Sequence, residues 1–225
     1  KSFIVNMKNV LANENIPVIK GMFNSLFVAA CSAVLSVYFS ALTAFAIHAY
    51  NFKLKKFAFT FILLVMMVPT QVSALGFVKM MGDWNLLNSY IPLIVPSVAA
   101  PVVFFFIKQY MDSVLPMELI EAARIDGANQ FQIYWKIFMP IMKPSLILVG
   151  VLNMLTVWND YLGPLIFLQD RSKYTLALGL ASFKGVHSTQ IIPMLCITII
   201  MIIPPIIIFI IAQKYIVEGT SGSIK

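Results

Sequence analysis

The chain has 225 residues, of which 60% are hydrophobic and 11% are charged, and its net charge is +7. Soluble domains carry roughly 25% charged residues, so the composition excludes an ordinary soluble domain. The basic residues are scattered among loops, which argues against a nucleic-acid partner, because in membrane proteins this pattern sets the orientation in the bilayer.

Long apolar runs without Asp, Glu, Lys or Arg dominate the chain. They occupy 21–52, 57–78, 84–107, 144–159 and 185–213. All but the fourth exceed the ~20 residues that cross a bilayer as a helix, and the fourth continues past Asp160 to Leu168. Because the runs are continuously apolar rather than alternating, helices are favoured over a β-barrel. The sequence therefore predicts an all-α membrane protein, a polytopic helical bundle with five membrane helices near 23–47, 57–78, 91–107, 145–167 and 191–212.

The loop charges predict the orientation of these helices. The loops on one side, including 108–143, hold nine of the basic residues, and those on the other side hold four. Basic loops stay in the cytoplasm, so the 108–143 loop and the tail 213–225 are expected inside, with 23–212 forming the transmembrane domain. Five crossings then place residues 1–22 outside, although they contain three lysines and no signal-peptide pattern. We expect an upstream helix that would make six in the native subunit; a five-helix protein is the alternative.

The longest polar insertion, residues 108–143, has the signals of two short helices that meet at a glycine. Pro116 suits a first helical turn, and Glu118 adds negative charge there. Gly127 can end the first helix with a positive φ, and Asn129 with Gln132 has the spacing of a capping box for the second.

The order of residues in this loop resembles the cytoplasmic coupling loop of ABC importer permeases. The matching residues are Glu121, Ala122, Ala123, Asp126, Gly127, Ile137 and Pro140. The family usually has Leu before the final proline, where this chain has Met139, a side chain of similar size. The resemblance implies a type I importer permease fold and a short helix that docks into a separate ATPase subunit. A helix resting on lipid headgroups is the alternative.

The same resemblance implies several partners. It predicts a second, similar but distinct permease subunit, two ATP-binding cassette subunits at the cytoplasmic loop and an extracellular solute-binding protein, in a bacterial-type plasma membrane. The outer loop 168–190, which contains Arg171, Lys184 and His187, is long enough to meet that binding protein; a solvated loop without a partner is the alternative.

Three further segments are similar to permeases of the maltose-type carbohydrate importers. These are Asn24-Ser25-Leu26, the stretch from Trp158 to Leu165, and Gln213 to Gly219. They imply a sugar or oligosaccharide as the substrate. Glycerol phosphate or an amino acid, imported by a protein of the same build, is an alternative. A secondary transporter is a third interpretation, but it would need paired charges inside the membrane, and Asp160 stands alone in its predicted crossing.

Polar and aromatic residues near Asp160 form a candidate substrate pathway. Counted along a helix from Pro144, Asp160 lies about 24 Å away at ~1.5 Å per residue, towards the outer surface. Helical spacing places positions 153, 156 and 160 on one face. The candidates for binding sugar hydroxyls or stacking on a sugar ring are Asn153, Thr156, Trp158, Asn159, Asp160 and Tyr161. An aromatic belt with a helix-capping cluster explains the same residues equally well.

Eight prolines within the predicted crossings, from Pro69 to Pro205, either bend helices or line cavities. No Gly-x-x-x-x-Gly-Lys-Ser/Thr phosphate loop occurs in the sequence, and the two histidines lie far apart by topology. Cys31 and Cys196 fall within apolar runs, which favours buried small residues over a disulfide. We therefore predict a non-enzyme without cofactor or metal of its own, with ATP and Mg²⁺ bound by the partner ATPase.

Overall fold

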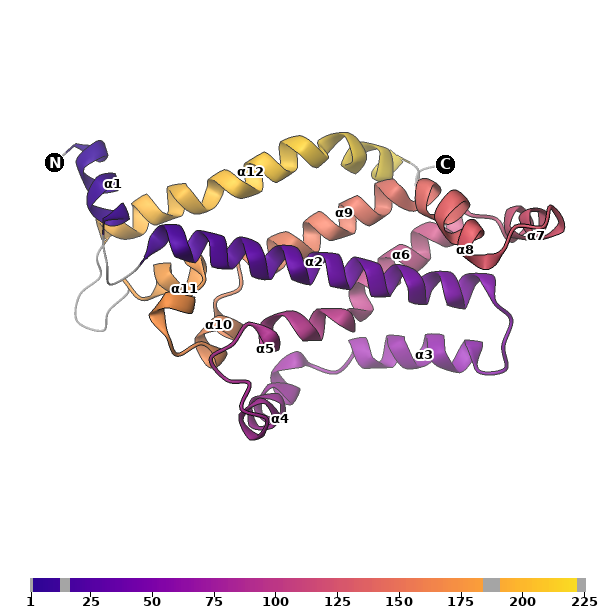
Figure 1. The fold of residues 1–225 in the computed structure, drawn as a ribbon, viewed down its shortest axis with the longest axis horizontal. Helices are drawn as coiled ribbons and strands as arrows, with labels where there is room; N and C mark the ends of the chain where they lie inside the picture. The colour runs from indigo at the N-terminus through magenta and orange to yellow at the C-terminus, as the bar shows by residue number, and fades with distance from the viewer. Residues whose placement is uncertain (1, 13–16, 184–190, 222–225) are drawn as a thin grey trace. The chain divides into compact units, whose positions relative to one another are not determined.

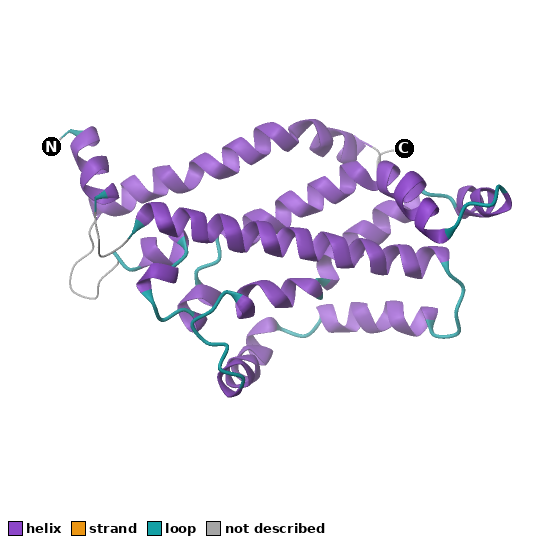
Figure 2. Cartoon of the chain, in the orientation of Figure 1, coloured by secondary structure: helices purple, strands orange, loops and turns teal. Residues whose placement is uncertain are grey.

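The computed structural model describes residues 2–12, 17–183 and 191–221. Every regular element within these residues is a helix (Figure 2), so the predicted all-α class is confirmed. In chain order (Figure 1) the helices are α1 (Phe3–Leu11), α2 (Val18–Ala49), α3 (Lys55–Met66), α4 (Thr70–Asp83), α5 (Ile91–Ile94), η1 (Val95–Val98), α6 (Pro101–Val114), α7 (Met117–Ile125), α8 (Gln130–Ile133), η2 (Tyr134–Phe138), α9 (Met139–Trp158), α10 (Leu162–Phe167), η3 (Arg171–Lys173), α11 (Leu176–Ala181) and α12 (Ile191–Ser221).

Four helical stretches within the described residues are long and apolar enough to cross a membrane. They are Val18–Ala49, Ile91–Val114, Gln130–Trp158 and Ile191–Tyr215. The predicted continuous helix over 57–78 is wrong, because α3 ends at Met66 and α4 begins at Thr70. Pro69 lies at this break, where it supplies no backbone N–H and disfavours helical geometry in the residue before it.

The third predicted crossing needs two corrections. The segment predicted as one helix over 91–107 is divided into α5, η1 and α6, with a break at residues 99 and 100. Since α6 continues to Val114, the start of the predicted loop 108–143 is helical.

The fourth predicted crossing needs a correction at both ends. The helix predicted over 145–167 begins at Gln130 and stops at Trp158, after which α10 is separate. Asp160 is therefore not inside this helix, and its position along a helix counted from Pro144 is wrong as well. Its side chain instead caps α10, a local hydrogen bond that competes with continued helix.

The chain divides into two compact units. Unit 1 comprises Lys1–Ser32, Ser73–Pro96 and Met154–Ile210, and unit 2 comprises Ala33–Val72, Ser97–Asn153 and Ile211–Lys225. Because α2 begins in unit 1 and ends in unit 2, the same helix contributes to both cores.

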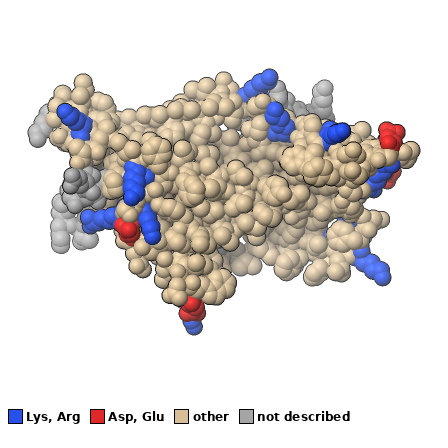
Figure 3. All heavy atoms as spheres, in the orientation of Figure 1, with Lys and Arg blue, Asp and Glu red and all other residues tan. Residues whose placement is uncertain are grey.

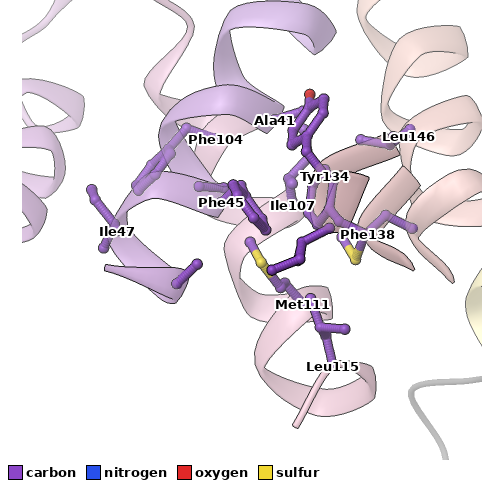
Figure 4. Packing of buried hydrophobic residues seen from close by; sticks show 14 of the residues in the cluster. Ala41, Phe45, Ile47, Phe104, Ile107, Met111, Leu115, Tyr134, Phe138 and Leu146 are labelled. Carbon is purple, nitrogen blue, oxygen red and sulfur yellow. The ribbon is translucent and has the colours of Figure 1, made fainter. Parts of the chain in front are cut away.

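The core of unit 2 is built from aromatic and long aliphatic side chains of α2, α6, η2 and α9 (Figure 4). The ring of Phe45 lies 5.2 Å from that of Tyr134 and 5.1 Å from that of Phe138, within the range of favourable aromatic pairs. Ile107 and Met111 of α6 are fully buried beside them. Residues of α7 and α8 pack into this core, which positions both helices.

The core of unit 1 is smaller and surrounds the end of α9. Trp158 is 2% exposed and packs in a cluster with Leu176 of α11 and Ile197 of α12. Cys196 is buried in the same cluster, whereas Cys31 is half-buried, and both thiols are free.

Small residues line the buried face of α2. They recur at three- and four-residue spacing, which keeps them on one side of a helix: Ser25, Ala29, Ser32, Ser36, Ser40 and Ala44. Small side chains allow neighbouring backbones to approach closely, as in membrane helix packing. Ser32 bonds the Leu93 carbonyl at 3.5 Å in unit 1, and Ser40 bonds the Ala100 carbonyl at 3.4 Å in unit 2.

Large apolar side chains remain exposed along the long helices. In the most apolar window of α12 only 11% of the residues are buried within the chain. The face drawn in Figure 3 has broad areas without Lys, Arg, Asp or Glu. Such surfaces require lipid or another apolar partner, as expected of a membrane protein.

Candidate functional site: the α7 loop and the α9–α10 junction

The local signals of the α7 loop form as the sequence predicts. Pro116 is the N-cap of α7 and Glu118 lies in its first turn. Gly127 ends the helix with φ of 82°, and Asn129 and Gln132 form a capping box at the start of α8. The amide of Gly127 donates to the Arg124 carbonyl at 3.1 Å and that of Ala128 to the Ala123 carbonyl at 3.0 Å. These are the two bonds of a Schellman motif, which makes the turn between the helices well defined.

One face of α7 is anchored in the core of unit 2. Ile120 is fully buried and Ala123 is 9% exposed, and both belong to the cluster that contains Leu115 and Phe138. Ala128 packs against the same cluster. Since positions 120 and 123 are one helical turn apart, α7 holds to the core by a single stripe.

The opposite face of α7 is exposed and partly apolar. Ile125 is 86% exposed, and Leu119 and Ala122 are exposed on the same helix. Phe131 of α8 is 72% exposed and its ring lies 6.0 Å from that of Trp135. We call Leu119, Ala122, Ile125 and Phe131 the apolar tip; in Figure 1, α7 projects from the end of α6.

The acidic residues of the motif lie beside the apolar tip. Glu121 and Asp126 are exposed, and neither makes a side-chain hydrogen bond or ion pair to another described residue. An exposed apolar patch with acidic groups around it has the composition of a protein-binding surface. Among the motif residues, Glu121, Ala122, Asp126 and Gly127 therefore face solvent, whereas Ala123 faces the core.

Ile137 and Pro140 lie in a different environment from the rest of the motif. Ile137 is half-buried against the core of unit 2, while Pro140 is exposed in the first turn of α9. Ile137 lies within η2, a π-helix, and the amide of Met139 at its end donates to the Tyr134 carbonyl. In a regular α-helix the ring of Pro140 would clash with the Lys136 carbonyl, and the wider π turn relieves that clash. This end of the motif shapes the helix rather than the exposed tip.

Arg124, which the sequence reasoning did not select, links α7 to α2. Its Nη2 donates to the carbonyl oxygen of Ala49, the last residue of α2, at 2.7 Å. Leu119, Ile125 and Phe131 were also missed. Helical spacing could have found Ile125, because it lies opposite the buried stripe of Ile120 and Ala123.

The candidate pathway residues of α9 are divided between the two units. Asn153 in unit 2 is half-buried, and its Oδ1 is buried without a hydrogen bond from the described residues. Thr156 in unit 1 is exposed. Both remain candidates for contacting a polar solute.

The residues around the α9–α10 junction have local structural partners. Trp158 is buried and its indole N–H donates to the Met201 carbonyl at 3.2 Å. Asn159 bonds back to the Leu155 carbonyl at 2.8 Å. The Oδ1 of Asp160 accepts from the amides of Leu162 at 3.0 Å and Gly163 at 3.3 Å, which caps α10. Tyr161 is 51% exposed and keeps its ring available for contact with a ligand.

Gly163 leaves room for the Asp160 cap. A Cβ atom at this position would lie 2.6 Å from Asp160 Oδ2 and 3.3 Å from Leu93 Cδ2. In the sequence, Gly163 stands out only as part of the Trp158–Leu165 segment that is similar to carbohydrate permeases. In the structure, the absence of a side chain at Gly163 allows the Asp160 carboxylate to lie over the start of α10.

Asn88 organises the described part of the outer loop. Its Oδ1 accepts from the amides of Gln169 at 3.2 Å and Asp170 at 3.0 Å, and its carbonyl accepts from Lys173 Nζ at 2.6 Å. The amide of Ser172 donates to Asp170 at 2.8 Å, and this hydrogen bond lowers the pKa of the Asp170 carboxyl. The predicted loop residues Lys184 and His187 lie outside the described residues.

The Asn-Ser start of the first apolar run holds the same loop. Asn24 Nδ2 donates to the carbonyls of Ser172 at 3.1 Å and Tyr174 at 3.0 Å. The hydroxyl of Ser25 accepts from the amide of Leu176 at 2.7 Å. This short motif therefore positions the outer loop within unit 1.

The chain is similar to known transport proteins along most of its length. A family model described as "Binding-protein-dependent transport system inner membrane component" matches residues 36–222. The arabinooligosaccharides transport system permease protein AraQ of Halalkalibacterium halodurans is 36% identical over 203 residues, which cover 90% of this chain and 72% of the relative. The sn-glycerol-3-phosphate transport system permease protein UgpE of Yersinia pestis is 31% identical over 217 residues, 96% of this chain and 77% of the relative.

A solved structure has the same fold. The crystal structure of a bacterial ABC transporter involved in the import of the acidic polysaccharide alginate matches with a TM-score of 0.80 at 23% identity. The match covers 94% of this chain and 79% of that chain.

Proposed function

Because the chain belongs to the family of inner membrane components of binding-protein-dependent transport systems, we propose that it forms half of the translocation pathway of an ATP-driven importer for a sugar or oligosaccharide. The solute is delivered by an extracellular binding protein that meets the outer loop 168–190. A second, distinct permease subunit supplies the other half of the pathway. Two ATP-binding cassette subunits on the cytoplasmic side bind ATP and Mg²⁺.

The single observation that carries the coupling role is the two-faced character of α7. Ile120 and Ala123 fix one face in the core of unit 2, while Ile125 on the other face is 86% exposed. An isoleucine of this exposure on a well-capped helix is not packed by the described residues of the chain. It supports docking of α7 into a cleft of the ATPase subunit, with Glu121 and Asp126 at the rim.

The coupling role is tested by Ile125→Asp in the assembled importer. A charge in an apolar docking pocket remains desolvated and unpaired, so co-purification of the ATPase subunits should fall at least roughly tenfold. Leu54→Asp is the matched control, because Leu54 is 65% exposed in the loop before α3 of the same unit. Equal ATPase recovery from Ile125→Asp and the unmodified chain would refute docking through α7.

The sugar assignment is supported by the relative that transports arabinooligosaccharides and by the resemblance of the Trp158–Leu165 segment to carbohydrate permeases. The glycerol-phosphate permease, 31% identical, makes an anionic polyol the second candidate. Both solutes present several hydroxyl groups, and only the second carries a phosphate.

Uptake by vesicles that contain the complete importer and its cognate binding protein distinguishes these solutes. We expect labelled arabinooligosaccharide to accumulate with ATP and an excess of glycerol phosphate to leave that uptake unchanged. Accumulation of glycerol phosphate alone would replace the sugar assignment without affecting the coupling role of α7.

A further inference from the structure

The C-terminal end of α2 is the attachment point of the α7 loop. The carbonyl oxygens of its last two residues, His48 and Ala49, accept hydrogen bonds from two cationic side chains. Lys55 Nζ donates to the His48 carbonyl at 3.2 Å, and Arg124 Nη2 donates to the Ala49 carbonyl at 2.7 Å. Cations at a helix C-terminus also interact favourably with the helix dipole. Arg124 comes from the last turn of α7, so this bond holds the end of that helix.

His48 holds the segment in front of α7. Its Nε2 lies 3.0 Å from the Leu115 carbonyl and its Nδ1 lies 3.0 Å from Asp112 Oδ1. The two ring nitrogens of His48 therefore face two acceptors, a backbone carbonyl and a carboxylate. Lys108 pairs with the same carboxylate, and the side chains of His48 and Lys108 are only 12% and 11% exposed. Leu115 directly precedes Pro116, the N-cap of α7.

We infer that His48 and Arg124 are positioning residues that connect the two ends of α7 to the end of α2. This inference rests on the proposed docking of α7 to the ATPase. His48 holds the entry to α7 through Leu115, and Arg124 holds its exit through Ala49. A displacement of α7 by the ATPase then moves α2, which begins in unit 1 and ends in unit 2.

Directional hydrogen bonds are needed here because the apolar contact alone does not fix the helix. Ile120 and Ala123 form one stripe, about which α7 can roll while it stays buried. Bonds at both ends prevent that motion. The Nε of Arg124 is buried without a partner among the described residues, so the guanidinium holds α2 through Nη2. A charge-assisted bond of this kind shifts an equilibrium by about tenfold or more.

The inference is tested in vesicles that contain the complete importer. Arg124→Gln and His48→Leu each remove one connection, and Lys56→Gln is the matched control, since Lys56 is an exposed cation beside Lys55. The measurements are ATPase co-purification, solute transported per ATP hydrolysed, and hydrogen exchange of residues 116–127. In both test variants the ATPase should remain bound, the transport ratio should fall about tenfold, and exchange of α7 should quicken. The Lys56 variant should match the unmodified chain.

Each result of these measurements either supports or overturns the positioning role of His48 and Arg124. A wild-type transport ratio with unchanged exchange in Arg124→Gln would overturn the inference. If that variant fails to assemble, His48→Leu decides, since it leaves Arg124 in place, and a wild-type ratio there would overturn the inference as well. Failure of both to assemble while Lys56→Gln assembles would show a role in folding rather than transmission, which also overturns it. The Ile125→Asp variant tests docking of α7 by ATPase binding alone. A failure of the docking proposal is therefore distinguishable from a failure of the positioning role of His48 and Arg124.

Discussion

At the scale of single residues, a substitution of Gly127 would strain the backbone without making a steric clash. Its φ is 82°, yet a Cβ atom there would meet nothing within 4 Å. Gly127→Val should therefore distort the turn through its backbone, at a cost of roughly 1–2 kcal/mol, whereas Gly127→Asn tolerates the left-handed conformation. We expect Val to reduce ATPase co-purification and uptake and Asn to retain both. Equal loss in both variants would mean that the missing side chain, and not φ, matters at this position.

Asp160 allows the capping and pathway interpretations to be compared directly. Asp160→Asn keeps an acceptor for the amides of Leu162 and Gly163, while Asp160→Ala removes it. We expect Ala to destabilise the chain by ~1 kcal/mol, seen as a lower melting midpoint, and Asn to leave midpoint and uptake unchanged. A drop in uptake for Asn at an unchanged midpoint would instead assign the carboxylate to the substrate pathway.

At the scale of elements, Pro140 maintains the π-helical turn η2. Pro140→Ala supplies a backbone N–H and removes the ring, so residues 134–139 can return to α-helical geometry. Closing the wide π turn to an α turn rotates α8 by about 100° relative to α9, which turns Phe131 away from the other residues of the apolar tip. We expect slower hydrogen exchange around residue 140 and weaker ATPase binding. If hydrogen exchange slows but ATPase binding is unchanged, the π-helical turn is not needed for docking.

The sequence predicts elements well where the signals are local. The glycine stop at Gly127 and the capping box at Asn129 need only neighbouring residues, and both form as predicted. The continuous helix over 57–78 fails because Pro69 outweighs the apolar run around it. The bond from Arg124 to Ala49 joins residues 75 positions apart, which local spacing does not reveal.

At the scale of the whole molecule, each unit has a group of polar side-chain contacts around one loop. In unit 1, Asn24 and Asn88 hold the segment around Ser172. In unit 2, His48 and Arg124 hold the segment around α7. The bonds of Asn24, His48 and Arg124 are partly buried, and they fix loops that would not hold by apolar burial alone. An importer needs two such defined loops, one for the solute-binding protein and one for the ATPase.

Loop charge predicts that these two loops lie on opposite sides of the membrane. Nine basic residues in one set of loops against four in the other predict that α7 is cytoplasmic and that residues 168–176 are extracellular. In a background without Cys31 and Cys196, Gln169→Cys should react with a membrane-impermeant maleimide in intact cells. Glu118→Cys should react only after permeabilisation, because both positions are exposed and differ only in the side that they face. Labelling of Glu118→Cys in intact cells would place α7 outside, where no ATP-driven subunit could reach it, and would overturn the coupling role.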